Sequence, residues 1–362
     1  MAYTTIDDPS AYFQTALYTG NGGTLAVTND GNSDMQPDWV WAKSRTQANS
    51  HVFFDVVRTF AGDKEIQSNN TGAEGASDSA GYGYISAVGS DGFTAKAGTT
   101  AGDYTNVSSQ NYVAWQWKAG TSFSNDASST SVGSIDSAGS VNTTAGFSII
   151  GYTGTGSAGT IAHGLGVKPS FILFKNRERA VNWLVYDKKN GANKFLYLNV
   201  TDAIGDDSGH FNDTEPTTSV FSVGGADGTN YSGENLIAYC FAEKQGYSKF
   251  GVYTGNNVVD GAFVYTGFKP AFVMVKLIDT QTDGWVIQDN KRDISNTGTS
   301  TRLRANTSNA EFTSTNEIDL LSNGFKCRGD DGEINGNGSK HIYMAFAENP
   351  FVTSTGVPAT AR

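Results

Sequence analysis

The sequence predicts an all-β protein of three tandem β-sandwich-like repeat units, each of about 100 residues. One observation is the composition, with 43 glycines in 362 residues, 12% aromatic residues and only 7 prolines. Aromatic and β-branched residues favour strands, and Gly, Asn and Asp favour the turns between them. A second observation is that no long segment places apolar residues at helical spacing. The third observation is an internal repeat.

The tripeptide YTG marks the repeat and begins at Tyr18, Tyr152 and Tyr253. After each YTG comes an apolar segment that starts with Pro and ends with Lys: PDWVWAK, PSFILFK and PAFVMVK. An apolar segment ending in Asp, a segment containing Asn, and a closing segment (YVAWQWK, LIAYCFAE or IYMAFAE) then follow in the same order. The near-constant spacing of these landmarks predicts three similar units.

The landmarks also set the expected boundaries. We expect an N-terminal arm (1–11), β units over 12–120, 146–246 and 247–351, and a C-terminal tail (352–362). Residues 121–145 are rich in Ser, Thr and Gly and are predicted to be a linker, although their Val and Ile residues also fit a short added strand. The period exceeds the usual 20–50 residues of a solenoid, so each unit is expected to have its own core.

The closing strand has one face that is apolar in all three units, because alternate residues of a strand face opposite sides. This face carries Val113, Trp115 and Trp117 in the first unit, Ile237, Tyr239 and Phe241 in the second, and Ile342, Met344 and Phe346 in the third. Aliphatic side chains at equivalent positions argue against an exposed platform for sugars. We therefore predict that Trp117, Phe241 and Phe346 are buried equivalents.

The segment that begins with Pro is apolar on both faces, as in PSFILFK, which predicts a central strand covered on both sides. A second sheet would cover one face, and loops or a neighbouring unit the other. Turn signals every 8–12 residues or so fit a β-sandwich. Galectin-like, jelly-roll and immunoglobulin-like topologies all remain compatible with the pattern.

The Lys and Asp landmarks are assigned structural roles. Lys43, Lys175 and Lys276 end one strand, and Asp55, Asp187 and Asp289 end the next. A hairpin would bring Lys175 near Trp183 and Lys276 near Trp285, which predicts cation–π contacts, with His51 at that position in the first unit. The Asp residues are expected to stabilise turns or act as caps.

No enzyme signature is found. The four histidines (His51, His163, His210 and His341) have no metal-ligand spacing, and no carboxylate pair is singled out for glycoside hydrolysis. We predict a protein that is not an enzyme and has no cofactor; the segment RGDDGEINGNG has the oxygen ligands of a calcium loop but lacks the spacing of an EF-hand. The net charge of −11 and the absence of a basic block argue against nucleic acid as a partner. No apolar run is long enough for a transmembrane helix, and the acidic start is unlike a secretory signal.

The loop before each closing strand is polar and differs between the units, while the strands keep their pattern. Variable polar loops on a rigid sandwich are typical of a recognition module. Candidate receptor contacts, for example with sugar hydroxyls, are Asp103, Tyr104, Asn106, Asp227, Asn230, Tyr231, Asp330, Asp331, Asn335 and Asn337. Ordinary solvated loops are the alternative interpretation.

Long phrases of the chain resemble a repeat family of tailed phages, marine ones in particular. They include TIDDPSAYFQTALYTGNGG, GFSIIGYTGTGSAGTIAHGLGVKPSFILFKNR, LIAYCFAEKQGYSKFGVYTGN and YMAFAENPF. Members of this family are described as tail fibre or virion structural proteins. The resemblance implies a location on the virion and no catalytic residues.

Three functions follow as expectations from the resemblance and the loops. The first is a tail fibre or spike component that binds a host-surface glycan, acts as a homotrimer and contacts other virion proteins. The second is a head-decorating or head-fibre protein without receptor binding. The third is a polysaccharide depolymerase. A tail location is expected over a head location, and assembly would follow synthesis in the host cytoplasm.

Overall fold

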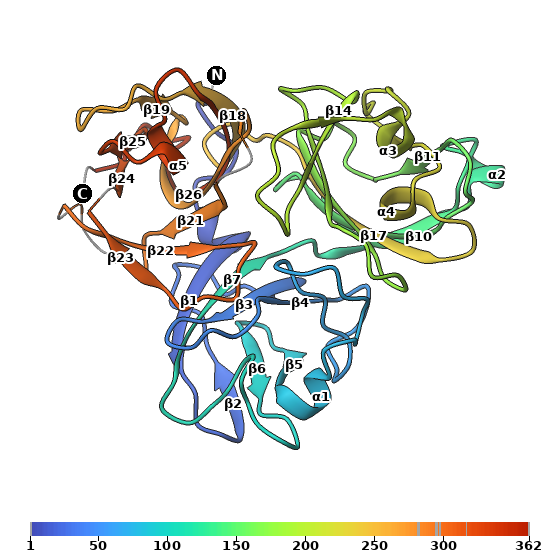
Figure 1. Cartoon of the computed structure of the whole chain (residues 1–362), viewed down its shortest axis with the longest axis horizontal. Helices are drawn as coiled ribbons and strands as arrows, with labels where there is room; N and C mark the ends of the chain where they lie inside the picture. Colours follow the sequence, from blue (N-terminus) through green and yellow to red (C-terminus); the bar gives the residue numbers. More distant parts are fainter. Residues whose placement is uncertain (1, 281–282, 294–295, 297, 316, 361–362) are drawn as a thin grey trace.

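Antiparallel β-sheets are the main regular elements of the structure, a computed structural model that describes residues 2–280, 283–293, 296, 298–315 and 317–360. The helices are single turns of three or four residues. Figure 1 shows three lobes around a common centre, in blue to cyan, green to yellow, and orange to red along the sequence. The prediction of an all-β, sandwich-like fold is confirmed.

The first lobe pairs a four-stranded sheet, in the order β1-β7-β3-β4, with a three-stranded sheet, β2-β6-β5. Its elements are η1 (Pro9–Ala11), β1 (Phe13–Thr19), β2 (Thr24–Val27), β3 (Trp39–Ser44), β4 (Val52–Asp55), α1 (Ser79–Tyr82), β5 (Tyr84–Val88), β6 (Phe93–Lys96) and β7 (Asn111–Trp117).

The second lobe has a large sheet, β15-β14-β13-β12-β17-β10-β9-β8, and a small one, β11-β16. Its elements are β8 (Thr121–Asn125), α2 (Ala127–Thr130), β9 (Ser137–Asn142), β10 (Phe147–Thr153), β11 (Gly159–Ala162), β12 (Phe171–Asn176), β13 (Leu184–Asp187), β14 (Lys194–Tyr197), β15 (Gly205–Asp206), α3 (Ser208–Phe211), β16 (Val220–Val223), α4 (Asp227–Asn230) and β17 (Asn235–Phe241).

The third lobe has the sheets β18-β26-β20-β21-β22-β23 and β19-β25-β24. Its elements are β18 (Ser248–Thr254), β19 (Phe263–Tyr265), β20 (Phe268–Leu277), β21 (Trp285–Asp289), β22 (Ser300–Arg304), β23 (Phe312–Ser314), β24 (Glu317–Leu321), β25 (Gly324–Arg328), α5 (Gly332–Asn335) and β26 (Lys340–Pro350).

One pairing order recurs in the three large sheets: β1-β7-β3-β4, β10-β17-β12-β13 and β18-β26-β20-β21. The register agrees with the sequence landmarks, because the landmark lysines pair with equivalent residues of the closing strand. These pairs are Lys43 with Val113, Lys175 with Ile237, and Lys276 with Ile342. The landmarks therefore mark one topology, in which the Pro-initiated segment forms an inner strand.

Residues 121–145 differ from a flexible linker because they form β8 and β9, which extend the second lobe's sheet. β9 pairs antiparallel with β10, and β8 pairs with β9. The alternative of an added strand therefore describes this segment better than the predicted linker does. Scattered apolar residues such as Val141, which is buried, anchor the segment among polar residues.

Each large sheet is buried on both faces, and one face belongs to a core that all three lobes share. In this core Trp117, Phe241 and Phe346 are each 1% exposed and contact one another, with ring centroids 5.5–6.4 Å apart. Trp39 stacks on Trp117 and on Tyr239 of the second lobe. The predicted burial of the closing strand is thus found, and neighbouring lobes provide the cover.

The opposite face of each large sheet packs on that lobe's small sheet and forms a separate core. Val40 and Phe93 lie in the core of the first lobe, Phe174 and Phe221 in that of the second, and Val275 and Phe325 in that of the third. Each lobe therefore has the expected core of its own, in addition to its share of the central one.

A ring of equivalent hydrogen bonds joins the lobes. The indole N–H of Trp183 donates to the carbonyl of Gln67 in the first lobe at 2.8 Å. The indole N–H of Trp285 donates to Tyr197 of the second lobe at 2.9 Å. At the third junction His51 Nε2 lies 3.0 Å from the carbonyl of Arg304, and because His51 Nδ1 accepts from the Trp41 indole, Nε2 carries the proton.

The predicted contact between the landmark lysines and these indoles is wrong. Lys175 Nζ donates instead to the carbonyls of Asn176, Arg179, Val181 and Thr71 at 2.8–3.2 Å, and Lys276 Nζ donates to those of Thr201 and Asp283. Each ammonium is buried beside backbone carbonyls of the loop that follows its strand, and these carbonyls accept its hydrogen bonds. Burial lowers the pKa of Lys43 and of Lys175 to about 7.

The Asp landmarks cap the turns that follow their strands, as predicted, and two of them also cross a lobe boundary. Asp55 accepts from the backbone N–H groups of Val57 and Arg58, and its carboxylate pairs with the Arg58 guanidinium at 2.6 Å. Asp289 pairs with Arg292 at 2.6 Å and accepts from the Trp115 indole of the first lobe at 3.1 Å. In the second lobe Asn190 takes the place of the arginine and donates to Asp187 at 2.7 Å.

Candidate binding site in the second lobe

Three of the ten candidate loop residues are buried, which corrects their assignment as receptor contacts. Asn106, Asn230 and Asn335 are each 0% exposed, and their side-chain oxygens accept from the backbone N–H of Asn21, Thr155 and Asn256, respectively. Their amide groups donate to further carbonyls. A carboxamide can accept and donate hydrogen bonds at the same time. In each lobe the asparagine therefore joins the loop after the first strand to the loop before the closing strand.

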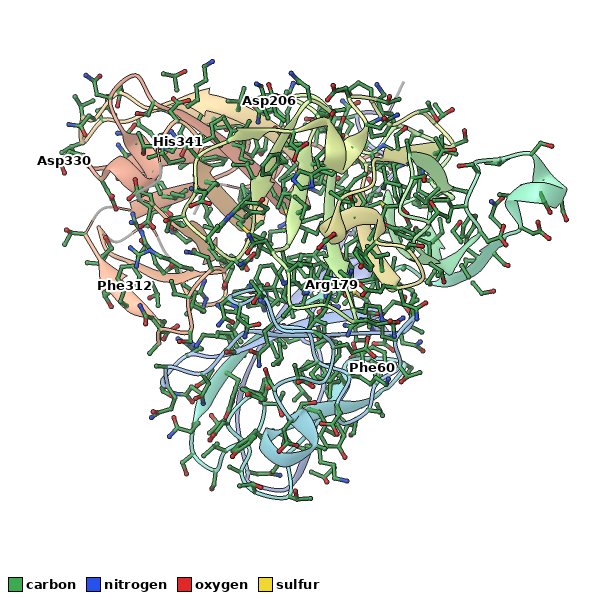
Figure 2. The ribbon with its side chains drawn as sticks, turned by 45° about the vertical axis from the view of Figure 1, so that its right-hand side comes forward. Phe60, Arg179, Asp206, Phe312, Asp330 and His341 are labelled. Carbon is green, nitrogen blue, oxygen red and sulfur yellow. The ribbon has the colours of Figure 1, made fainter. Side chains whose placement is uncertain are left out.

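The other candidates do not form one surface, because they belong to three different lobes. Asp227, Tyr231, Asp330 and Asn337 are exposed, and Asp103, Tyr104 and Asp331 are half-buried. Asp331 caps α5 and binds Arg302. Figure 2 shows Asp330 on the outer side of the third lobe, away from Arg179 at the border between the first and second lobes. Any ligand of these loops therefore binds in one lobe.

A cavity of about 360 Å³ lies beside one of these candidates, Asp227. Its walls are the loop before β13, the start of α4, and β14, with Thr71 of the first lobe closing one side. Polar groups come from Asn182, Tyr197 and His210, and apolar contacts from Val181 and Leu184. Its size and its mixture of apolar walls with a few polar groups suit a small ligand.

The cavity exists because glycine stands at residue 228. Gly228 lies two residues before the buried Asn230. The residues two positions before the equivalent asparagines are Tyr104 in the first lobe and Glu333 in the third. Glu333 fills its lobe with a salt bridge to Arg304 and accepts from Gly284 N–H. Tyr104 reaches the Ser77 carbonyl at 3.1 Å. In the second lobe no side chain projects from this point, and the space stays open.

Leu184 occupies part of the space that Gly228 leaves. A Cβ at Gly228 would lie 2.3 Å from Leu184 Cδ2. A larger residue at position 228 therefore does not fit beside Leu184. The strand position of Leu184 holds a smaller valine, Val52 or Val286, in the lobes that carry Tyr104 or Glu333. The floor of the cavity is therefore apolar, and its rim is polar.

The rim has donors and acceptors in different positions. The exposed Asp227 carboxylate has no hydrogen bond with another described residue and offers only acceptors. The Asn182 oxygen accepts from Asn199 at 2.8 Å, and the Asn182 side chain is also hydrogen-bonded to the Tyr197 hydroxyl. Tyr197 contributes a half-buried ring and a hydroxyl, and burial raises its pKa, which keeps the hydroxyl protonated.

His210 adds an unpartnered buried nitrogen. Its side chain packs edge-on against Phe195 at 4.3 Å, and Nδ1 has no hydrogen-bond partner. Burial lowers the pKa of His210, so the imidazole is neutral at pH 7.

Arg179 and Tyr231 stack on each other close to the cavity, since Arg179 precedes the lining residue Ala180. The guanidinium lies 3.7 Å from the centre of the Tyr231 ring and binds Glu234 at 2.7 Å. Tyr231, a candidate from the sequence, is thus held by the loop that leads into the cavity wall. The sequence identified Asp227 and Tyr231 but not Asn182, Tyr197 or His210.

The remaining reactive residue types have structural environments. Cys240 and Cys327 are free and buried, and burial raises both thiol pKa values, that of Cys327 to about 11. His163 binds Thr217 O and Leu165 N, and burial lowers its pKa to about 4. Within the described ranges, no group of three His, Cys, Asp or Glu side chains could hold a metal ion. No described helix is long and apolar enough to span a membrane.

Residues 8–350 match the family model described as a domain of unknown function (DUF7483). The chain belongs to the DUF7483 family. No curated protein matches it, and no solved structure does.

Proposed function

We propose that this DUF7483 protein is a non-catalytic recognition protein of a phage particle and that it binds a surface glycan in the second-lobe cavity. The observation that carries the proposal is Gly228, which leaves a 360 Å³ cavity where the other lobes hold Tyr104 and Glu333. Two of the three related lobes fill this position with a side chain, and only the second leaves it open. This difference favours a ligand site in the second lobe over a purely structural loop.

The chemistry of the cavity favours a sugar. A sugar hydroxyl both donates and accepts, and the rim offers an acceptor at Asp227, a donor at Asn182 and both at Tyr197. The apolar floor at Leu184 and Val181 suits the carbon-bound face of a sugar ring. Asp227 is the only charged residue of the lining, which favours a neutral ligand over an anionic one.

The phage setting rests on the resemblance of the sequence phrases to tail fibre and virion structural proteins. Self-association, with a homotrimer as the expected form, belongs to this proposal because linked copies raise the effective affinity of a weak site by roughly 10²–10⁴. Light scattering of the purified protein tests it, and a stable monomer in solution and on the particle would refute it.

A glycan array with the purified protein tests the recognition role. We expect binding to a small set of neutral host-surface glycans, and loss of that binding in an Asn182→Ala variant. Binding to no glycan would favour the head-decorating alternative, which antibody labelling of intact particles checks by showing head or tail. Steady release of reducing ends from a bound polysaccharide would instead identify a depolymerase.

A further inference from the structure

One sheet edge that is covered in the second lobe is open in the first. β10 lies between β17 and β9, so strands pair with both of its edges. The equivalent strand β1 pairs with β7 alone and ends its sheet. The two strands share the pattern FxxxxYT, with Phe13 and Phe147 opposite the central residues Trp117 and Phe241. β1 is therefore equivalent to β10, but it lacks the neighbouring strand that β9 provides to β10.

A groove of about 310 Å³ lies beside the start of β1. One wall is the loop at Asp30, and the other is the third lobe, at Asn290, Lys291 and residues 347–349. Ala347, within β26, follows Phe346 as Lys118 follows Trp117. In the second lobe β9 lies beside Lys118, where Asn142 Nδ2 donates to the Lys118 carbonyl at 3.3 Å. The groove thus occupies the position that β9 fills next to β10.

Polar and apolar groups of β1 are left without partners at this edge. Thr15 lines the groove, is 4% exposed, and its hydroxyl has no hydrogen-bond partner. Leu17 further along the strand is 38% exposed, where β10 has Gly151. Proteins usually cover an open sheet edge or place charged residues on it, which prevents pairing with another chain. An open edge with an exposed aliphatic residue therefore fits a strand that pairs with a partner.

We propose that the edge of β1 binds an extended segment of a partner polypeptide as an antiparallel strand, in the register that β9 adopts on β10. In that register Ser140 lies opposite Ile149, the equivalent of Thr15. A serine in the partner strand would pair with the Thr15 hydroxyl, because directly opposed Ser and Thr side chains hydrogen-bond across strands.

The fit of β9 also defines the other residues of the partner strand. Gly139 lies opposite Ile150, and a Cβ there would lie 1.8 Å from the Ile149 carbonyl oxygen. The partner residue opposite Ala16 is therefore glycine, and its neighbour opposite Leu17 is small, as Ala138 is opposite Gly151. The occupant is a strand rich in Ser, Gly and Ala, such as SAGSVN of β9 itself.

Binding of a labelled synthetic peptide with the sequence of residues 135–143, IDSAGSVNT, to the full-length protein tests the proposal. We expect saturable binding, with slower amide hydrogen exchange over 13–19 and not over 147–153. Thr15→Val is expected to weaken binding about 3- to 10-fold, the effect of one hydrogen bond. Leu17→Lys, which places a charge on an exposed edge, should abolish binding.

Thr153→Val serves as the matched control, because Thr153 lies on β10, whose edges are both paired. It should bind the peptide as the unchanged protein does. Absence of binding at millimolar peptide, or equal binding by Leu17→Lys and the unchanged protein, would overturn the proposal. Thermal unfolding of each variant separates loss of binding from loss of fold, and protection confined to loops away from β1 would also contradict it.

Discussion

The Tyr239 hydroxyl of the second lobe donates to the Asp55 carboxylate of the first lobe over 2.7 Å. Both side chains are fully buried, and the Arg58 guanidinium binds the same carboxylate oxygen. A buried charge is tolerated when it is paired and hydrogen-bonded, so this contact requires the two lobes to fold against each other. The lobes are therefore parts of one folded body.

Phe241→Ala is expected to cost about 3–5 kcal/mol of unfolding free energy, because the ring is enclosed by the central residues of all three lobes. Chemical denaturation of both proteins measures the difference. Tyr231→Ala, on the exposed rim, is the matched control and should cost far less. A Phe241→Ala protein as stable as the parent would contradict the shared core.

An isolated second lobe, residues 121–246, is expected not to fold stably. One face of its large sheet, including Phe171, Trp183 and Tyr239, is buried only by the other two lobes and would be exposed to water. Circular dichroism and sizing of the fragment measure this. A monomeric fragment with a sharp unfolding transition of its own would show that the lobes are independent domains.

Exchange of an ion pair for an apolar pair should be tolerated where the lobes meet. Where the first and third lobes meet, Arg45 forms two hydrogen bonds of 2.8 Å with Glu311. Where the third and second lobes meet, Ile278 takes the place of Arg45 and Ile204 that of Glu311. Both junctions have the same backbone hydrogen bond, from Glu311 N–H to the Arg45 carbonyl and from Ile204 N–H to the Ile278 carbonyl. We expect Arg45→Ile with Glu311→Ile to lie within about 1 kcal/mol of the parent, and Arg45→Ile alone to be less stable than the pair. A double-mutant cycle measures the coupling, and strictly additive effects would argue against the equivalence.

Asp187 should make stability depend on pH. Burial raises its pKa from 3.8 to about 6, since Asn190 stands where the other lobes have an arginine. A carboxyl whose pKa is higher in the folded state favours folding when protonated, and this contribution is lost as the pH rises from about 4 through 6. Asp187→Asn should therefore be more stable than the parent by about 3 kcal/mol at pH 7 and equal to it below pH 4. The same stability difference at both pH values would refute this.

Local pattern was sufficient to predict the strands, their order along each unit and the burial of Trp117, Phe241 and Phe346. Strand periodicity shows which residues share a face, but it does not show what covers that face. For this reason the sequence left open whether a neighbouring lobe covers the large sheet. The shared core depends on contacts between residues that are more than a hundred positions apart.

The loops were harder to predict because asparagine in a Gly-rich loop resembles a solvated residue. Asn106, Asn230 and Asn335 recur at one position while their neighbours change, and such regularity is typical of a structural role rather than of the receptor contacts predicted from composition. At Gly228, by contrast, the three units differ. The other lobes have Tyr104 and Glu333 at this position, and they have valine in place of Leu184.

Filling the second-lobe cavity with the third lobe's own side chains tests the proposal that this cavity binds a sugar. The variant Gly228→Glu, Tyr197→Arg and Leu184→Val recreates the pair formed by Glu333 and Arg304 beside Val286. Titration calorimetry with the glycan selected on the array measures affinity, and Asp330→Asn on the third lobe is the matched control. We predict that the filled variant folds and loses binding, while the control binds as the parent does. Unchanged affinity in the filled variant would contradict the claim.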